Sequence, residues 1–172
     1  MTQEDESLRK RARALLAPKD GARQEVVEAC LVALALEASP KAGERVYQAQ
    51  CAVCHKMGTS RGQAFGPDLA SLGNRQARNL LADILDPNRS IADDYDLWTV
   101  SLKDGGNEQG IIAAETSSAI TLRLMTGQER VISRQAISSM TLMAISAMPE
   151  NLENTISDQQ MANLLAFIRQ RD

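Results

Sequence analysis

The chain has 172 residues and a formal net charge of -3, so it lacks the basic excess of a nucleic-acid-binding protein, and an aromatic content of 3% is low for stacking on bases. No apolar run approaches the roughly 18 residues needed to cross a membrane as a helix. We therefore expect no nucleic-acid partner and no membrane span, in one domain or one domain with a small second module.

Residues 1–39 are expected to form a helical N-terminal extension. Glu6 to Leu16 and Arg23 to Ala38 both predict helices, separated by a break at Pro18 to Gly21. The second helix has an apolar stripe of Val26, Val27, Cys30, Leu31 and Leu34. This pattern predicts that Cys30 is a buried thiol, and the helix pair resembles the end of a helical-repeat region.

The most informative motif is Cys51-Ala52-Val53-Cys54-His55, the C-x-x-C-H pattern by which haem is attached to a polypeptide. Two thiols on one short helical turn can form thioethers with the two vinyl groups of one porphyrin. The imidazole of His55 then supplies the proximal ligand of the iron. A helix from about Lys41 to Gln50 is expected to lead into the motif.

Two other interpretations of the motif remain open. A structural zinc site takes four ligands, whereas only Cys30 is left as a third thiol and His55 is the single histidine. A thioredoxin-like redox pair requires a βαβ context, which does not surround Cys51. Covalent haem is the preferred interpretation, with a metal site and a redox-active thiol pair as alternatives.

The pattern changes from helical to alternating along the second half of the chain. A short helix is predicted from Asn79 to Leu85, closed by Asp86-Pro87. Strands are predicted at residues 97–103, 110–115, 120–125 and 129–133, with 137–142 as a further candidate. A final amphipathic helix, Ser157 to Arg169, completes the expected elements.

Several motifs together resemble a known family. Gly43 and Tyr47 before the haem motif, then Gly66-Pro67-Asp68-Leu69, resemble class I cytochrome c. The run Ile84-Leu85-Asp86-Pro87-Asn88, a β-rich insert and Met148-Pro149-Glu150 are similar to the planctomycete-type haem-binding domain, a C-terminal module of larger exported proteins.

The resemblance implies a fold class: mainly α, a class I cytochrome c helical fold with an inserted small antiparallel β meander or barrel, α+β overall. The haem domain is then expected at residues 40–94 and 144–172, with the β module at 95–143. The resemblance also implies that the Pro67 carbonyl accepts a hydrogen bond from His55, and that the first and last helices cross near Gly43, Tyr47 and Phe167.

The sixth ligand of the iron is narrowed by counting. No second histidine exists, so the candidates are a methionine, a lysine, an exogenous ligand or none. Among the methionines, Met140, Met143 and Met148 remain, because the others are expected in helices, in a strand or too near the haem motif. Met148 is favoured because Pro149 keeps the segment extended, and because Met148-Pro149 matches the family's Met-Pro pair. The residues expected to contact haem are Cys51, Cys54, His55, Met148, Phe65, Pro67, Leu69, Leu72, Arg75, Leu85 and Arg89, with His55 and Met148 on the iron and the arginines on a propionate.

These features predict an electron-transfer protein rather than an enzyme, with one covalent haem c and a redox partner protein or domain such as a dehydrogenase. Haem attachment is normally completed outside the cytoplasm, yet Met1 to Arg23 lacks the apolar segment of a signal peptide. We therefore expect a segment of a longer periplasmic or otherwise exported protein. A haem enzyme or gas sensor with an open sixth site and a structural or interaction module are the alternatives.

Overall fold

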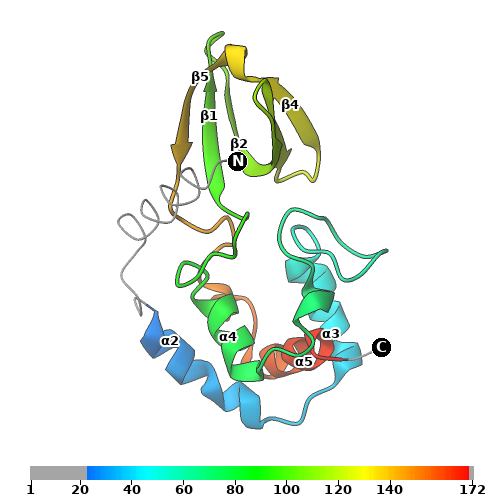
Figure 1. Ribbon diagram of the computed structural model, residues 1–172. Helices are drawn as coiled ribbons and strands as arrows, with labels where there is room; N and C mark the ends of the chain where they lie inside the picture. Colours follow the sequence, from blue (N-terminus) through cyan, green and yellow to red (C-terminus); the bar gives the residue numbers. More distant parts are fainter. Residues whose placement is uncertain (1–22, 171–172) are drawn as a thin grey trace. The chain divides into compact units, whose positions relative to one another are not determined.

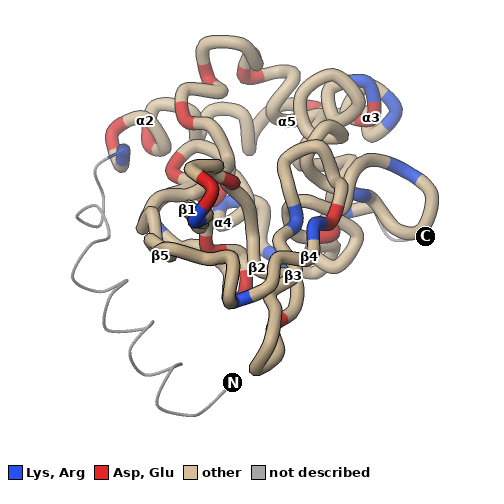
Figure 2. Tube along the Cα trace, turned by 90° about the horizontal axis from the view of Figure 1, so that it is seen from above, with Lys and Arg blue, Asp and Glu red and all other residues tan. Residues whose placement is uncertain are grey.

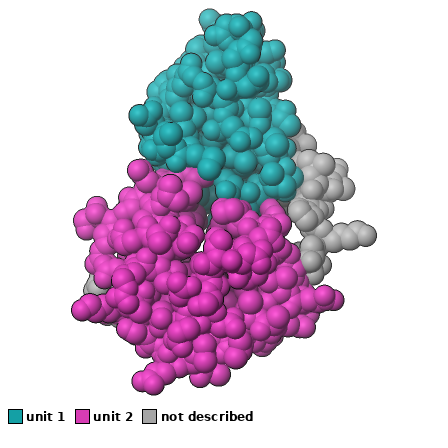
Figure 3. All heavy atoms as spheres, turned by 180° about the vertical axis from the view of Figure 1, so that it is seen from behind, with its two compact units in different colours: residues 1–19, 91–147 teal, residues 20–90, 148–172 magenta. Residues whose placement is uncertain are grey.

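The computed structural model describes residues 23–170, so the expected helix from Glu6 to Leu16 and the break after it lie outside the described residues. The chain divides into two compact units (Figure 3). Of the described residues, 91–147 form one unit, and 23–90 with 148–170 form the other. The domain boundaries drawn from the sequence remain a prediction.

The first unit is an antiparallel sheet of five strands in the order β4-β3-β2-β1-β5 (Figure 1). The strands are β1 (Leu97–Leu102), β2 (Asn107–Glu115), β3 (Ala119–Leu124), β4 (Glu129–Ser133) and β5 (Ile137–Leu142). All five strands lie where alternation predicts them. Strand β2 begins three residues earlier than expected, because pairing with β1 continues to Asn107 opposite Ser101, and β3 begins one residue earlier.

The sheet has its own core, formed by side chains from one face of its strands. The fully covered members are Val100, Ile120, Leu122 and Ile132. Register shifts interrupt the β1–β5 pairing and the β2–β3 pairing, and bulges of this kind increase local bending and twist. The inward residues therefore gather into one cluster.

The second unit holds the described helices, which are short. The α-helices are α2 (Gln24–Ala29), α3 (Pro40–Val46), α4 (Ala77–Leu85) and α5 (Asp158–Ile168). Further turns are η1 (Cys30–Ala35), η2 (Tyr47–Cys51), η3 (Leu69–Leu72) and η5 (Leu152–Asn154), with η4 (Arg134–Ala136) in the sheet unit. Of these, η2 is a π-helical turn and the others are 3₁₀ turns.

The expectation of a mainly α chain, with a class I cytochrome c helical fold and a small β insert, is wrong. The five strands contain about as many residues as the four described α-helices. Two of the expected helices end early, because η1 follows α2 at Cys30 and η2 follows α3 at Tyr47. The alternating pattern of residues 97–142 gives a complete sheet rather than a minor addition.

The change of helix type also corrects the apolar stripe of the N-terminal segment. A 3₁₀ turn has three residues per turn instead of 3.6, so the face of the helix shifts after Cys30. Ala33 is buried in the core as a result, whereas Leu34 is 39% exposed. Cys30 is half-buried against the core, and burial, followed by the nearby Asp158 and Glu153 carboxylates, raises the pKa of its thiol.

The core of the helical unit forms where α3 and α5 cross (Figure 1). A Cβ atom on Gly43 would lie 1.9 Å from the backbone oxygen of Asn163, so only glycine permits this approach. Next to the crossing, the rings of Tyr47 and Phe167 lie 5.5 Å apart. Helix α5 begins with a capping box in which Ser157 and Gln160 exchange hydrogen bonds, which fixes the start of the helix. The expected helix crossing is therefore confirmed.

We expect Gly43→Ala to destabilise the protein by about 1–3 kcal/mol, because the added methyl group meets backbone that cannot rotate away. Alanine ordinarily stabilises a helix interior relative to glycine, so the sign of the change is diagnostic. Gly73→Ala is the control, because its Cβ would lie 3.8 Å from the nearest neighbouring atom, and it should be neutral or slightly stabilising. Urea denaturation measures both, and equal stabilities would contradict the proposed packing.

Candidate haem-attachment site

The C-x-x-C-H motif folds as a single turn at the end of the π-helical turn η2. The backbone N–H of Ala52 donates to the Tyr47 carbonyl over 2.9 Å, which is the five-residue spacing of a π turn. The N–H groups of Cys54 and His55 both donate to the Cys51 carbonyl, over 3.0 and 2.8 Å. Both thiols and the imidazole are thereby carried on one short turn.

The loop after the motif folds back onto the same turn. The N–H groups of Phe65 and Gly66 donate to the Cys54 carbonyl over 3.0 and 2.7 Å. The N–H of Leu69 donates to the Lys56 carbonyl over 2.9 Å. These bonds close a compact loop whose far end contacts the imidazole of His55.

The His55 ring is held from two sides. Its Nδ1 lies 2.8 Å from the Pro67 carbonyl oxygen, and because a carbonyl can only accept, Nδ1 carries the proton. The Cβ position of Gly66 lies 2.5–3.0 Å from three atoms of the ring, so the loop backbone lies directly against the imidazole. The proton on Nδ1 leaves the lone pair of a neutral imidazole on Nε2, which is the form that binds a metal.

The backbone of His55 is fixed as well. The Tyr47 hydroxyl donates to the His55 carbonyl over 2.9 Å. A Cβ on Gly62 would lie 2.1 Å from that carbonyl oxygen and 2.3 Å from the Tyr47 hydroxyl, and Gly62 has φ +75°. Both the space and the backbone angle therefore require glycine at position 62.

Burial sets the protonation of the motif. It raises the pKa of the Cys51 thiol to about 11, with Cys54 as a second cause, and it raises the pKa of Cys54 as well. It lowers the pKa of His55, against the opposing effect of the Pro67 hydrogen bond. At neutral pH the turn thus presents two thiols and a neutral imidazole, the groups that haem attachment requires.

The remaining expected contact residues fall into two groups. Phe65, Leu69 and Leu85 are buried, and Leu72 is half-buried against the core of the helical unit. Arg75 and Arg89 both bind the same carboxylate: Arg75 Nε lies 2.6 Å from Asp83, and Arg89 lies 3.0 Å from it. The hydrogen bond that Arg75 donates to Asp83 raises the pKa of Arg75. Propionate contacts of these arginines remain a prediction.

The three methionines considered for the iron differ in their surroundings. Met148 belongs to the same unit as His55 and lies in an irregular segment outside any helix or strand, half-buried. Met140 is paired with Val100 and packs against the core of the sheet. The sulfur of Met143 lies 3.2 Å from the Thr99 hydroxyl, which donates to it.

Two further residues, Asp68 and Gly62, shape this loop. The Asp68 carboxylate accepts from the N–H groups of Gly58 and Ala70, each over 3.0 Å, and so joins the two ends of the loop. The sequence marks Asp68 as the N-cap of the short helical turn that follows it. This position accounts for only one of the two hydrogen bonds. Gly62 belongs to no motif that would single it out.

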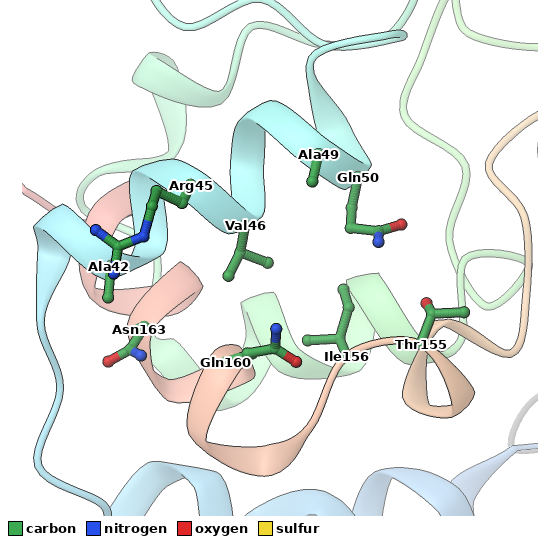
Figure 4. A pocket seen from close by; sticks show the side chains of 9 residues that line it. All are labelled: Ala42, Arg45, Val46, Ala49, Gln50, Thr155, Ile156, Gln160 and Asn163. Atoms are coloured by element: carbon green, nitrogen blue, oxygen red, sulfur yellow. The ribbon is translucent and has the colours of Figure 1, made fainter.

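A cavity of about 220 Å³ lies between α3 and α5 and is separate from the motif (Figure 4). Val46, Ala49 and Gln50 line it from one side, with Ile156 and Gln160 from the other. None of Cys51, Cys54 and His55 lines it, and its one charged lining residue is Arg45. We assign it no part in haem attachment.

Charges of both signs are interspersed along the described chain (Figure 2). Around the motif they are paired: Lys56 lies 3.7 Å from Asp68, and Arg61 lies 2.9 Å from Glu44. Among residues 23–170, no three His, Cys, Asp or Glu side chains gather as they would around a metal ion. Within the same range, no helix is long and apolar enough to span a membrane.

Comparison with known proteins agrees with the geometry of the motif. A family model described as cytochrome c oxidase, cbb3-type, subunit III matches residues 38–168, well over half of the chain. The chain belongs to this family of c-type cytochrome domains, whose cofactor is haem c and whose general function is haem-based electron transfer with a redox partner.

No curated protein matches the chain. A solved structure of the pleiotropic translational regulator Hfq is 19% identical over 39% of this chain and 100% of that chain, with a TM-score of 0.26. A likeness of that size supports no conclusion about this protein.

We expect Gly66→Ala to displace the His55 ring, because the new methyl group would lie within 3.0 Å of three ring atoms. The absorption and electron paramagnetic resonance spectra of the haem-loaded protein should then change, since both depend on the proximal ligand. Gly73→Ala is the control: like Gly66 it has no positive φ, but its Cβ would lie 3.8 Å from the nearest neighbouring atom. Identical spectra for Gly66→Ala and wild type would contradict the packing of the loop on the ring.

Proposed function

We propose that this protein is a single-haem c-type cytochrome that transfers one electron at a time through a covalently bound, His/Met-ligated haem. The observation that carries the proposal is the His55–Pro67 hydrogen bond on a turn that also holds Cys51 and Cys54. It leaves a neutral imidazole with Nε2 available, beside two unpaired thiols. When bound, haem supplies one-electron chemistry at its iron.

The roles of the chain's own residues follow from this proposal. Cys51 and Cys54 form the thioethers, His55 binds the iron and Pro67 fixes the orientation of its ring. Phe65, Leu69, Leu72 and Leu85 exclude water from the porphyrin. Arg75 and Arg89 bind propionates, with Asp83 holding both guanidinium groups in position.

Met148 is the proposed sixth ligand. Met148 belongs to the same unit as His55, whereas Met140 and Met143 belong to the sheet unit, where Met140 packs against the sheet core and Met143 accepts from Thr99. A thioether that stays on the iron in both oxidation states requires little rearrangement, which favours fast electron transfer. Retention of one ligand pair also distinguishes a carrier from a haem enzyme or gas sensor, which needs an open position.

The wider setting is part of the same proposal. The similarity to the planctomycete-type haem-binding domain favours a module of a longer exported, periplasmic protein, with residues 95–143 as a β module within the haem domain. The electron donor would be a dehydrogenase domain or partner, and the acceptor a downstream carrier. Attachment of haem through thioethers outside the cytoplasm supports the exported location.

Covalent attachment is tested directly on the haem-loaded protein. Acidified acetone should leave the haem on the chain, and the pyridine haemochrome should absorb where two saturated vinyl groups place it. Cys51→Ala should shift the haemochrome to the position of a single thioether. Extraction of the haem, or stoichiometric zinc in its place, would end the proposal.

The identity of the sixth ligand is tested by Met148→Ala. This variant should lose the weak sulfur-to-iron band of the ferric protein, bind carbon monoxide readily when reduced, and have a lower reduction potential, because a thioether favours ferrous iron. Met140→Ala is the control and should cost only stability, about 2–5 kcal/mol if its packing is fully lost. A wild-type protein that itself binds carbon monoxide readily would instead favour a haem enzyme or gas sensor.

A further inference from the structure

Arg23 makes three different contacts with one guanidinium group. Its Nε donates to the Leu85 carbonyl over 2.7 Å, one Nη donates to the Asn151 side-chain oxygen over 2.8 Å, and the other Nη pairs with Glu153. The side chain is only 14% exposed. All three nitrogens of the planar fork are therefore used, which a flexible surface arginine does not achieve.

The partners of Arg23 lie on both sides of a single junction. Leu85 is the last residue of α4, whereas Asn151 and Glu153 follow Met148 by three and five residues. A second bond joins the same two segments, because Asn88 donates to Glu150 over 2.6 Å. The chain directly after Met148-Pro149 is thus tied to the end of α4.

The segment that follows Met148-Pro149 contains residues that depend on the contacts of Arg23. Asn151 has φ +66°, a left-handed conformation that costs a residue with a side chain free energy unless its surroundings hold it. One oxygen of Glu153 is buried without a hydrogen-bond partner among the described residues, so the carboxylate depends on Arg23 for its charge balance. Loss of Arg23 would leave both residues poorly compensated.

We infer that Arg23 is a positioning residue for the sixth iron ligand: it clamps the 148–154 segment to α4 and so keeps Met148 from leaving the iron. The inference rests on the proposed ligation by Met148. Arg23 lies outside residues 38–168, the region that the family model matches. The inference therefore gives a role to a residue that the family match does not cover.

The test is the rate at which imidazole binds to the ferric, haem-loaded protein, a rate limited by release of the methionine. Arg23→Gln should accelerate binding by roughly tenfold or more, the loss expected for hydrogen bonds to charged groups. Arg23→Lys should give an intermediate rate, since it keeps a charge for Glu153 but cannot make all three contacts. It also serves as the second variant if Arg23→Gln yields no folded protein.

Arg134→Gln is a matched control in the sheet unit. Arg134 makes two of the same kinds of contact, with Nε on the Thr116 carbonyl over 2.8 Å and an Nη on Glu115 over 2.7 Å. It should leave imidazole binding unchanged even if stability falls. If the wild type shows the sulfur-to-iron band and both Arg23 variants bind imidazole at the wild-type rate, the inference about Arg23 is overturned and the Met148 proposal stands. A wild type without that band would overturn the Met148 proposal, and the inference with it.

Discussion

The close approach of α3 to α5 at Gly43 is the constraint from which the candidate site is built. It brings Tyr47 against Phe167, and the Tyr47 hydroxyl then reaches the His55 carbonyl over 2.9 Å. Because Tyr47 is fully buried, that hydroxyl has little freedom to move. The packing of α3 on α5 thereby fixes the position of the His55 backbone, the backbone of the proposed iron ligand.

The turn formed by Cys51 to His55 could be predicted from the sequence because its interactions are local. The hydrogen bonds that shape it join residues between Tyr47 and Leu69, and the contact of Pro67 with His55 spans only 12 positions. Residue types with one main use, two cysteines with a histidine and a Gly-Pro pair, mark both ends of the loop. The strands could be predicted equally well, since the alternation of apolar and polar residues depends only on which face of a sheet is buried.

The balance of the fold and several site contacts could not be predicted in this way. Periodicity detects an apolar face but not the switch to 3₁₀ or π turns that shortens α2 and α3. The lengths of these helices were therefore overestimated, and Leu34 was predicted on the buried face although it is exposed. Arg23 bonds across 62, 128 and 130 positions, and Asp83 binds two arginines that a sequence offers only as isolated charges. Such partners are set by tertiary packing.

This contrast between local and distant contacts has a physical consequence for the proposed haem site. The His55 side is held by a short loop that bonds to itself, whereas the Met148 side depends on contacts between segments far apart in the chain. Residues 148–151 lie outside any helix or strand, and irregular segments of this kind open with less free energy than packed helices. On the proposed ligation, the methionine side is therefore the weaker half of the coordination, and contacts that hold residues 148–154 determine how often it opens.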